Sequence, residues 1–290
     1  MAWRNCFKWI MAACGFLLLA PSAQANGIDN SSLSGNEFRE HKTTYGLVYR
    51  LPDEVVAELT IKIGKPLQDA LQRLNLKAEA STFNLPHVTV LHIHNPDPQT
   101  PKKMLDALSA IKLPPVLQDV VLKNFYTTEA AKGAGRPWWL DLGIVKSGNA
   151  YTEMMAFNTR AAPVLTPLRD GPLPRVTGPV YAKMGDAGKE LVKTVGVSGL
   201  NTIKDGKELQ SHNPHNTLVY SMTLFTPELE AAMNQVAAEF NKILPDGITT
   251  TFKTVSIVEL AFSGNVLREI YRIDLNDGSA VDVATGKAVK

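Results

Sequence analysis

The chain has 290 residues, with 30 Lys and Arg against 28 Asp and Glu, and a formal charge of +2. Arg4 and Lys8 account for both surplus charges, so the rest of the chain carries 28 basic and 28 acidic side chains and is formally neutral. A neutral chain lacks the excess of positive charge that binds long duplex nucleic acid. We therefore expect no such partner, whereas a small anionic ligand held locally is compatible with this balance.

The first 25 residues have the features of a secretory signal. Arg4 and Lys8 form a basic start, residues 10–20 are mostly apolar, and the small residues Ala23 and Ala25 flank a cleavage site. The apolar stretch is shorter than a typical membrane span. We expect cleavage after Ala25, a periplasmic or secreted protein, and no membrane association after the signal is removed.

Both cysteines, Cys6 and Cys14, lie within this signal. The mature chain then has no disulfide, no thiol nucleophile and no cysteine metal site. About 265 residues remain, which is long enough to build a hydrophobic core without disulfides. We expect one domain over residues 44–276, in a monomeric protein.

The start of the mature chain is polar. Residues 26–43 are rich in Ser, Asn and Gly and predict a flexible leader. Residues 45–51 predict a strand that ends at Pro52. Residues 55–63 fit a strand or a helix, and the leucines that follow have helical spacing. Residues 277–290 form a tail without a readable signal.

Residues 85–91 form a short β-like stretch that carries His87 and Thr89. In a regular strand these two side chains share one face, and Val88 and Val90 point to the other, toward a core. Thr100-Pro101 then predicts a helix start with Thr100 as N-cap. Leu113-Pro114 closes this helix, and strands are expected over 116–125 and 138–145.

The same order recurs around His215 and Thr217, which also share a face if this segment is extended. Thr226-Pro227 predicts a helix start, Leu244-Pro245 a helix end, and strands are expected over 249–260 and 269–275. We interpret this order as an internal structural repeat. The alternative is that Thr-Pro and Leu-Pro, both common at helix ends, coincide by chance.

A long connection separates the two halves. Residues 151–168 predict a helix, and residues 169–211, rich in Gly, Pro and Lys, are too long for a plain loop. We expect a hairpin-bearing insertion that flanks a cleft. Its lysines, Lys183, Lys189 and Lys193, either meet a substrate phosphate or, as the simpler interpretation, are solvated on an exposed hairpin.

Two imidazoles with neighbouring hydroxyls suit phosphodiester chemistry. Cleavage needs one proton taken from the attacking oxygen and one given to the leaving oxygen, and imidazole can serve both roles near neutral pH. Thr89 and Thr217 can donate hydrogen bonds to the phosphoryl oxygens. For either His87 or His215 alone, the simpler interpretation is a core histidine bonded to the backbone.

The other histidines carry weaker signals. His92 and His94 have the opposite parity to His87 in a regular strand, and we expect them in solvent or at a loop edge. Their spacing could bind zinc, but no acidic or cysteine ligand lies close by in sequence. His212 lies an odd number of residues before His215 and is expected to face elsewhere. Of the adjacent Trp138 and Trp139, a strand would send one inward and one outward.

The paired His-x-Thr strings, each preceded by proline within the same order of elements, resemble the two-histidine (2H) phosphoesterases, which include cyclic phosphodiesterases and relatives of the bacterial 2'-5' RNA ligase. The resemblance covers roughly residues 45–275. It implies an α+β, bilobal, pseudo-two-fold fold of two mainly antiparallel sheets, with helices outside and a central cleft. Two departures are the spacing of 128 residues between the histidines (215 − 87) and the polar Asn216 in place of an apolar residue.

The resemblance further implies metal-independent hydrolysis of a cyclic phosphodiester without a cofactor. It assigns His215 as general base and His87 as general acid, an order that the sequence itself does not give. Tyr220 and Tyr271 match family positions that contact phosphate or a base, although core or rim tyrosines fit equally well. The expected substrate is a 2',3'-cyclic nucleotide or a short RNA end. Two alternatives stay open: a non-catalytic periplasmic nucleotide- or phosphate-binding protein, and a zinc-dependent hydrolase.

Overall fold

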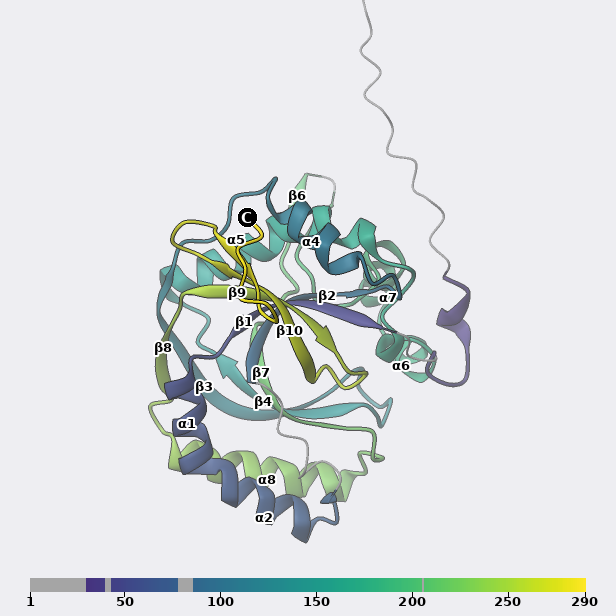
Figure 1. Ribbon diagram of the computed structural model, residues 1–290. Coiled ribbons are helices and arrows are strands. Elements are labelled where there is room, and N and C mark those ends of the chain that lie inside the picture. The colour runs from purple at the N-terminus through teal and green to yellow at the C-terminus, as the bar shows by residue number, and fades with distance from the viewer. Residues whose placement is uncertain (1–29, 40–42, 78–85, 205) are drawn as a thin grey trace, which may run out of the picture.

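The computed structural model describes residues 30–39, 43–77, 86–204 and 206–290 (Figure 1). The predicted signal lies outside the described residues. Within these ranges, no helix combines the length and the apolar character needed to cross a lipid bilayer.

The fold is α+β and is built on a large antiparallel sheet. The strands are β1 (Thr44–Arg50), β2 (His87–His94), β3 (Leu117–Glu129), β4 (Trp138–Ile144), β5 (Thr202–Lys204), β6 (Lys207–Leu209), β7 (His215–Ser221), β8 (Ile248–Phe252), β9 (Thr254–Leu260), β10 (Val266–Asp274) and β11 (Ala280–Asp282). Nine of them form one sheet in the order β11-β10-β9-β1-β2-β7-β4-β3-β8, and β5 and β6 form a separate hairpin.

The helices cover this sheet. The α-helices are α1 (Asp53–Leu59), α2 (Lys65–Arg73), α4 (Thr100–Leu108), α5 (Gly148–Leu165), α6 (Pro179–Lys183), α7 (Asp186–Val195) and α8 (Pro227–Ile243). Shorter turns are the 3₁₀ helices η1 (Ser31–Ser34), η3 (Thr166–Leu168) and η4 (Pro174–Val176), and the π-helix η2 (Thr60–Gly64). Figure 1 shows α1, α2 and α8 together below the sheet, and α4 and α5 above it.

The predicted repeat is present in the order of elements. The first unit is β2–α4–β3–β4, and the second is β7–α8 followed by β8, β9 and β10. One prediction was wrong in detail: residues 249–260 form two strands that separate at Lys253, because β8 pairs with β3 at one edge of the sheet and β9 pairs with β1 near its middle.

The two helix starts differ. Thr226 is the N-cap of α8, and its hydroxyl accepts a hydrogen bond from the Leu229 amide, as predicted. Thr100 is instead the first residue inside α4 and is fully buried. Its expected capping role was wrong, because the carboxylate of Asp97 binds the Gln99 amide and starts the turn one residue earlier.

The two motif strands, β2 and β7, meet in the middle of the sheet. A single register pair, Val88 with Asn216, joins them, so the two sheets expected from the resemblance are connected into one. The Asn216 amide is fully buried and donates to the His87 carbonyl at 3.0 Å. The polar residue that departs from the family pattern therefore fastens one motif strand to the other.

Each motif strand carries a β-bulge directly after its threonine. The register of β2 with β1 skips Val90, and the register of β7 with β4 skips Leu218. A bulge inserts one residue and reverses the alternation of side chains beyond it. Positions three residues after each threonine, His92 and Tyr220, therefore return to the face that carries the His-x-Thr pairs.

Buried amides on α5 and its neighbours hold the first bulge. Asn158 donates to the Val90 carbonyl at 2.6 Å and accepts from the Asn201 amide at 2.8 Å. Asn201 in turn accepts from the His212 backbone amide at 3.1 Å. Because all these groups are buried or partly buried, the network ties the bulge of β2 to the segment that leads into β7.

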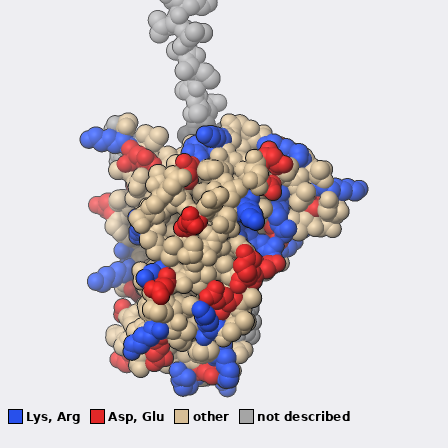
Figure 2. All heavy atoms as spheres, turned by 90° about the vertical axis from the view of Figure 1, so that its left-hand side faces the viewer, with Lys and Arg blue, Asp and Glu red and all other residues tan. Residues whose placement is uncertain are grey.

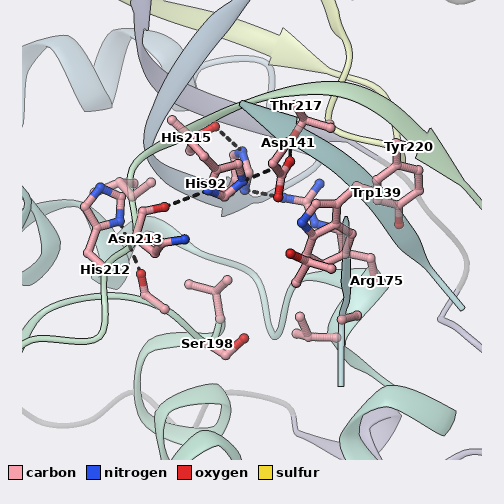
Figure 3. A pocket seen from close by; sticks show the side chains of 18 of the residues that line it. His92, Trp139, Asp141, Arg175, Ser198, His212, Asn213, His215, Thr217 and Tyr220 are labelled. Carbon is pink, nitrogen blue, oxygen red and sulfur yellow. Dashed lines mark hydrogen bonds and ion pairs between the residues drawn. The ribbon is translucent and has the colours of Figure 1, made fainter. Parts of the chain in front are cut away.

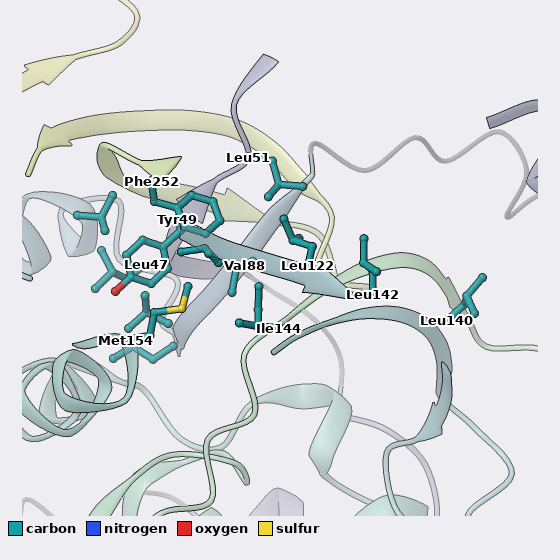
Figure 4. Packing of buried hydrophobic residues seen from close by; sticks show 14 of the residues in the cluster. Leu47, Tyr49, Leu51, Val88, Leu122, Leu140, Leu142, Ile144, Met154 and Phe252 are labelled. Carbon is teal, nitrogen blue, oxygen red and sulfur yellow. The ribbon is translucent and has the colours of Figure 1, made fainter. Parts of the chain in front are cut away.

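The core lies against the sheet, where β1 is buried along nearly its whole length. Figure 4 shows Leu47 and Tyr49 of β1 beside Val88 of β2 and Phe252 of β8. The rings of Tyr49 and Phe252 lie 5.4 Å apart. Apolar contacts of this kind join strands that are far apart in sequence, and they set the position of the motif strands.

Charges of both signs are interspersed on the face of the molecule shown in Figure 2. Two arginines of β10 form ion pairs, Arg268 with Glu259 at 2.6 Å and Arg272 with Glu269.

We predict that Asn158→Leu destabilises the protein by about 2–6 kcal/mol, although leucine is the more apolar side chain. The substitution leaves the Val90 carbonyl and the Asn201 amide buried without partners, at about 1–3 kcal/mol each. Urea unfolding monitored by circular dichroism measures the difference. Thr152→Leu, an exposed change on the same helix, should alter stability by less than about 0.5 kcal/mol; equal effects of the two changes would contradict the prediction.

Candidate active site

A cavity of about 320 Å³ opens between the two motif strands and the inserted segment (Figure 3). Its lining includes His87 and Thr89 from β2 and His215 and Thr217 from β7. Both predicted His-x-Thr pairs therefore converge on one space, although 128 residues separate the histidines.

Five of the six site residues predicted from the sequence line this cavity: the two His-x-Thr pairs and Tyr220. The sixth, Tyr271, lies on β10, where it is partly buried against the hydrophobic core, and it is not among the lining residues. Tyr271 is separated from the motif strands by β9 and β1 in the sheet order.

The tautomer of His215 follows from its hydrogen bond. Nδ1 lies 2.6 Å from the Asn213 carbonyl, which can only accept, so Nδ1 carries the hydrogen. In the neutral ring, Nε2 is then the unprotonated nitrogen. Nε2 lies 3.7 Å from Oδ1 of Asp141, a carboxylate that can compensate a positive charge on the ring.

Asp141 is a buried carboxyl on β4 with only 1% of its surface exposed. Burial raises its pKa to about 6, against the opposing effects of His215 and of the Thr217 hydroxyl. Thr217 donates its hydroxyl hydrogen to Oδ1 of Asp141 at 2.8 Å. In this arrangement Thr217 therefore presents lone pairs, not a hydrogen, to the cavity.

His92 lines the cavity, and the expectation that it lies in solvent or at a loop edge was wrong because of the Val90 bulge. Nδ1 of His92 accepts a hydrogen bond from Nη2 of Arg175, since a guanidinium can only donate. The ring hydrogen is then on Nε2, 3.4 Å from Oγ1 of Thr89. Burial and the adjacent Arg175 lower the pKa of His92, so this ring stays neutral.

The hydroxyls of Thr89 and Thr217 consequently differ in their hydrogen bonds. Thr89 can accept from His92 and keep its own hydroxyl hydrogen for a ligand, whereas the hydrogen of Thr217 is taken by Asp141. The structure thus sets one hydroxyl as a donor toward the cavity and the other as an acceptor for as long as Asp141 is ionised.

His212 also lines the cavity, contrary to the prediction that it faces elsewhere. The strand parity used for that prediction does not apply, because β7 begins only at His215. Nδ1 of His212 lies 3.3 Å from the Gly199 carbonyl, and burial lowers the pKa of this imidazole to about 4. His212 is therefore neutral near pH 7.

An aromatic pair forms part of the wall. Trp139 and Tyr220 stack with their ring centroids 6.0 Å apart and their planes at 5°. Trp138 points the other way, is fully buried and stacks on Phe225. The alternation expected for the two tryptophans is confirmed, and the outward ring lies at the cavity.

The inserted segment contains the expected hairpin, β5–β6, together with η4, α6 and α7. It closes one side of the cavity through Arg175, Val176 and residues 197–200. None of the described lysines considered from the sequence, Lys183, Lys189 and Lys193, is a lining residue. The cation that this segment places at the cavity is Arg175.

Sequence reasoning missed Asp141, Arg175, His92 and His212. One signal was present for Asp141, a single acidic residue within the otherwise apolar strand of residues 138–144. A charged side chain in such a strand has to be partnered or functional. No comparable signal marks Arg175, which lies in a loop-rich segment with several other cations.

His92 and His94 do not converge as a pair. His92 faces the cavity, whereas Nδ1 of His94 lies 3.4 Å from the Thr44 hydroxyl in the buried contact between β2 and β1. The expectation that His94 lies in solvent or at a loop edge was therefore wrong as well. Among the residues that the structure describes, no group of three or more His, Cys, Asp or Glu side chains lies close enough to hold a metal ion.

Comparisons with known proteins identify no family for this chain. No family model matches the chain, and no curated protein matches it. Among solved structures, Usb1 of Kluyveromyces marxianus is similar with a TM-score of 0.38 and 10% identity, covering 78% of this chain and 97% of Usb1. Usb1 with uridine monophosphate gives a TM-score of 0.34 and 8% identity over the same shares. Likeness at this level establishes neither the family nor the function of the chain.

Proposed function

We propose that the protein is a metal-independent phosphodiesterase of the two-histidine kind that hydrolyses a 2',3'-cyclic phosphate on a nucleotide or a short RNA end. The observation that carries this proposal is the convergence of two His-x-Thr pairs on a single cavity of about 320 Å³. A volume of this size is at the lower end of the range for small-molecule sites, about 300–1,000 Å³.

His215 is the general base in this proposal. Its Nε2 takes a proton from the attacking water, and the carboxylate of Asp141 at 3.7 Å stabilises the imidazolium that forms. The water oxygen bonds to phosphorus, and the bond from phosphorus to one ribose oxygen breaks. His87 gives that oxygen a proton, so the product is a nucleoside monophosphate.

Hydrogen bonds to the phosphoryl oxygens come first from Thr89, whose hydroxyl hydrogen is free of the contact with His92. Thr217 can donate as well once Asp141 takes up a proton or the hydroxyl turns away from it. Donors fixed before the reaction stabilise the charge that grows on these oxygens in the transition state.

Two further histidines lie beside the two that we assign to proton transfer. His92 and His212 also line the cavity. Burial and Arg175 lower the pKa of His92, and burial lowers the pKa of His212, so both rings are neutral near pH 7. A group that does not titrate near neutral pH is a poor proton carrier. His92 and His212 are therefore not assigned to proton transfer.

One prediction concerns His87 and His215. His87→Ala and His215→Ala should each lower kcat on adenosine 2',3'-cyclic phosphate by about 100-fold or more, because each removes one proton-transfer group. Hydrolysis is followed by chromatography of the monophosphate in the presence of EDTA.

His94→Gln, a change on the same strand but outside the cavity, is the matched control and should retain turnover when folded. Undiminished turnover in either alanine variant would refute the assigned roles. Loss of wild-type activity with EDTA and its return with zinc would favour a zinc-dependent hydrolase, and tight nucleotide binding without turnover would favour a non-catalytic binding protein.

Another prediction follows from Asp141. Its folded-state pKa of about 6 lies above the usual 3.8, so the folded protein holds a proton that the unfolded chain has already lost between these values. The wild type therefore loses stability as pH rises through this window. Asp141→Asn has no such proton to lose.

We expect the stability of Asp141→Asn relative to the wild type to increase by about 2–3 kcal/mol between pH 4 and pH 7. Urea unfolding of both proteins at matched pH values measures this change. Glu228→Gln, a fully exposed acidic position on α8, should show no increase of this kind. A pH-independent difference between Asp141→Asn and the wild type would contradict the assigned pKa.

A further inference from the structure

Arg175 is a cation in the wall of the cavity without an acidic partner. Within the described part of the chain, no carboxylate oxygen lies within 4.0 Å of its guanidinium, and its hydrogen-bond partner there is the neutral His92. A guanidinium carries five N–H donors, and the bond to His92 uses one of them. Arg175 is half-buried, and a partly desolvated charge is costly unless an anion compensates it.

A second hydrogen-bond donor, the hydroxyl of Tyr220, lies in the same part of the cavity wall as Arg175. This hydroxyl is buried and has no hydrogen-bond partner among the described residues. Tyr220 and Arg175 are close enough to interact electrostatically, and both line the cavity. A buried hydroxyl without a partner costs free energy, which a ligand oxygen accepting its hydrogen would recover.

The guanidinium of Arg175 packs closely against a glycine, which leaves space for it. Gly264, in the loop between β9 and β10, lies so close that a Cβ there would be 3.0 Å from Nη1 of Arg175. Figure 3 places Arg175, Tyr220 and Trp139 on one side of the cavity and His212 and Asn213 on the other. Arg175 of η4 and Tyr220 of β7 thus place two hydrogen-bond donors in the same part of the cavity wall.

This place is next to the position that we propose for the reacting phosphate, but it is distinct from it. One imidazole ring, that of His92, separates the guanidinium of Arg175 from the hydroxyl of Thr89. An anion bound by Arg175 and a phosphate bound by Thr89 can therefore belong to the same small molecule.

We propose that Arg175 and Tyr220 form a second anion subsite, which binds the 5'-phosphate of the nucleotide whose 2',3'-cyclic phosphate is cleaved. The proposal rests on the proposed function and makes it more specific. The preferred substrate is then a phosphorylated chain end, such as the last nucleotide of an RNA, rather than a nucleoside 2',3'-cyclic phosphate with a free 5'-hydroxyl.

The test compares adenosine 2',3'-cyclic phosphate with and without a 5'-phosphate. In the wild type the 5'-phosphate should raise kcat/KM by about 10- to 100-fold, as expected for charge-assisted hydrogen bonds to a phosphate. Arg175→Gln should reduce this ratio to about one. Tyr220→Phe, which removes only the unpartnered hydroxyl, should lower the ratio without loss of stability. Lys183→Gln removes an exposed charge from the same inserted segment and should leave both activity and ratio unchanged.

A binding measurement separates this inference from the proposed function. Calorimetry compares adenosine 3',5'-bisphosphate with adenosine 3'-monophosphate on the wild type and on Arg175→Gln. If the second phosphate tightens binding to the wild type alone, the subsite stands even where no cyclic phosphate is hydrolysed. If the wild type hydrolyses cyclic phosphates but gains neither affinity nor kcat/KM from the 5'-phosphate, the subsite is refuted and the proposed function stands.

Discussion

The geometry of the cavity depends on two β-bulges at equivalent places in the motif strands. Each follows a threonine, at Val90 in β2 and at Leu218 in β7. Without the extra residue, His92 and Tyr220 would point to the opposite face, into the packed side of the sheet. Because of the bulges, each motif strand places three side chains at the cavity instead of two: its histidine, its threonine and the residue three positions after the threonine. The buried amide of Asn158 fixes the first bulge by taking up the Val90 carbonyl.

The hydrogen bonds around the cavity determine where each proton lies. Carbonyl and guanidinium partners fix the tautomers of His215 and His92 respectively, because one can only accept and the other only donate. The two threonines then receive opposite roles, although the sequence treats them alike. Thr89 accepts from a neutral histidine, and Thr217 donates to a buried carboxyl. Two strands that match in sequence are therefore not equivalent in chemistry.

The inserted segment completes the site rather than merely connecting the halves. It supplies Arg175 and the backbone carbonyl that orients His212, and it closes one side of the cavity. Asn201 of the same segment joins the hydrogen-bond network that holds the bulge of β2. The position of this segment is consequently coupled to that of a motif strand, and substrate recognition can depend on it without any change in the His-x-Thr pairs.

The sequence alone determined the order of the elements and the four residues of the two pairs. Local signals carried these predictions, since alternation places His and Thr on one face of a strand, and proline with threonine marks a helix start. Periodicity also identified α2, α8 and the first strand. These features depend on neighbours in the chain, and such neighbours are visible in a sequence.

Only the tertiary structure decided which other side chains reach the site. The bulges at Val90 and Leu218 arise from how β2 meets β1 and how β7 meets β4, and a regular parity count misplaced His92 as a result. Arg175 and Asp141 reach the cavity from segments remote from both motifs. The chemical role of each charge depends on its burial and on the groups that it faces. Contacts between distant parts of the chain leave no local pattern, because packing in three dimensions sets them.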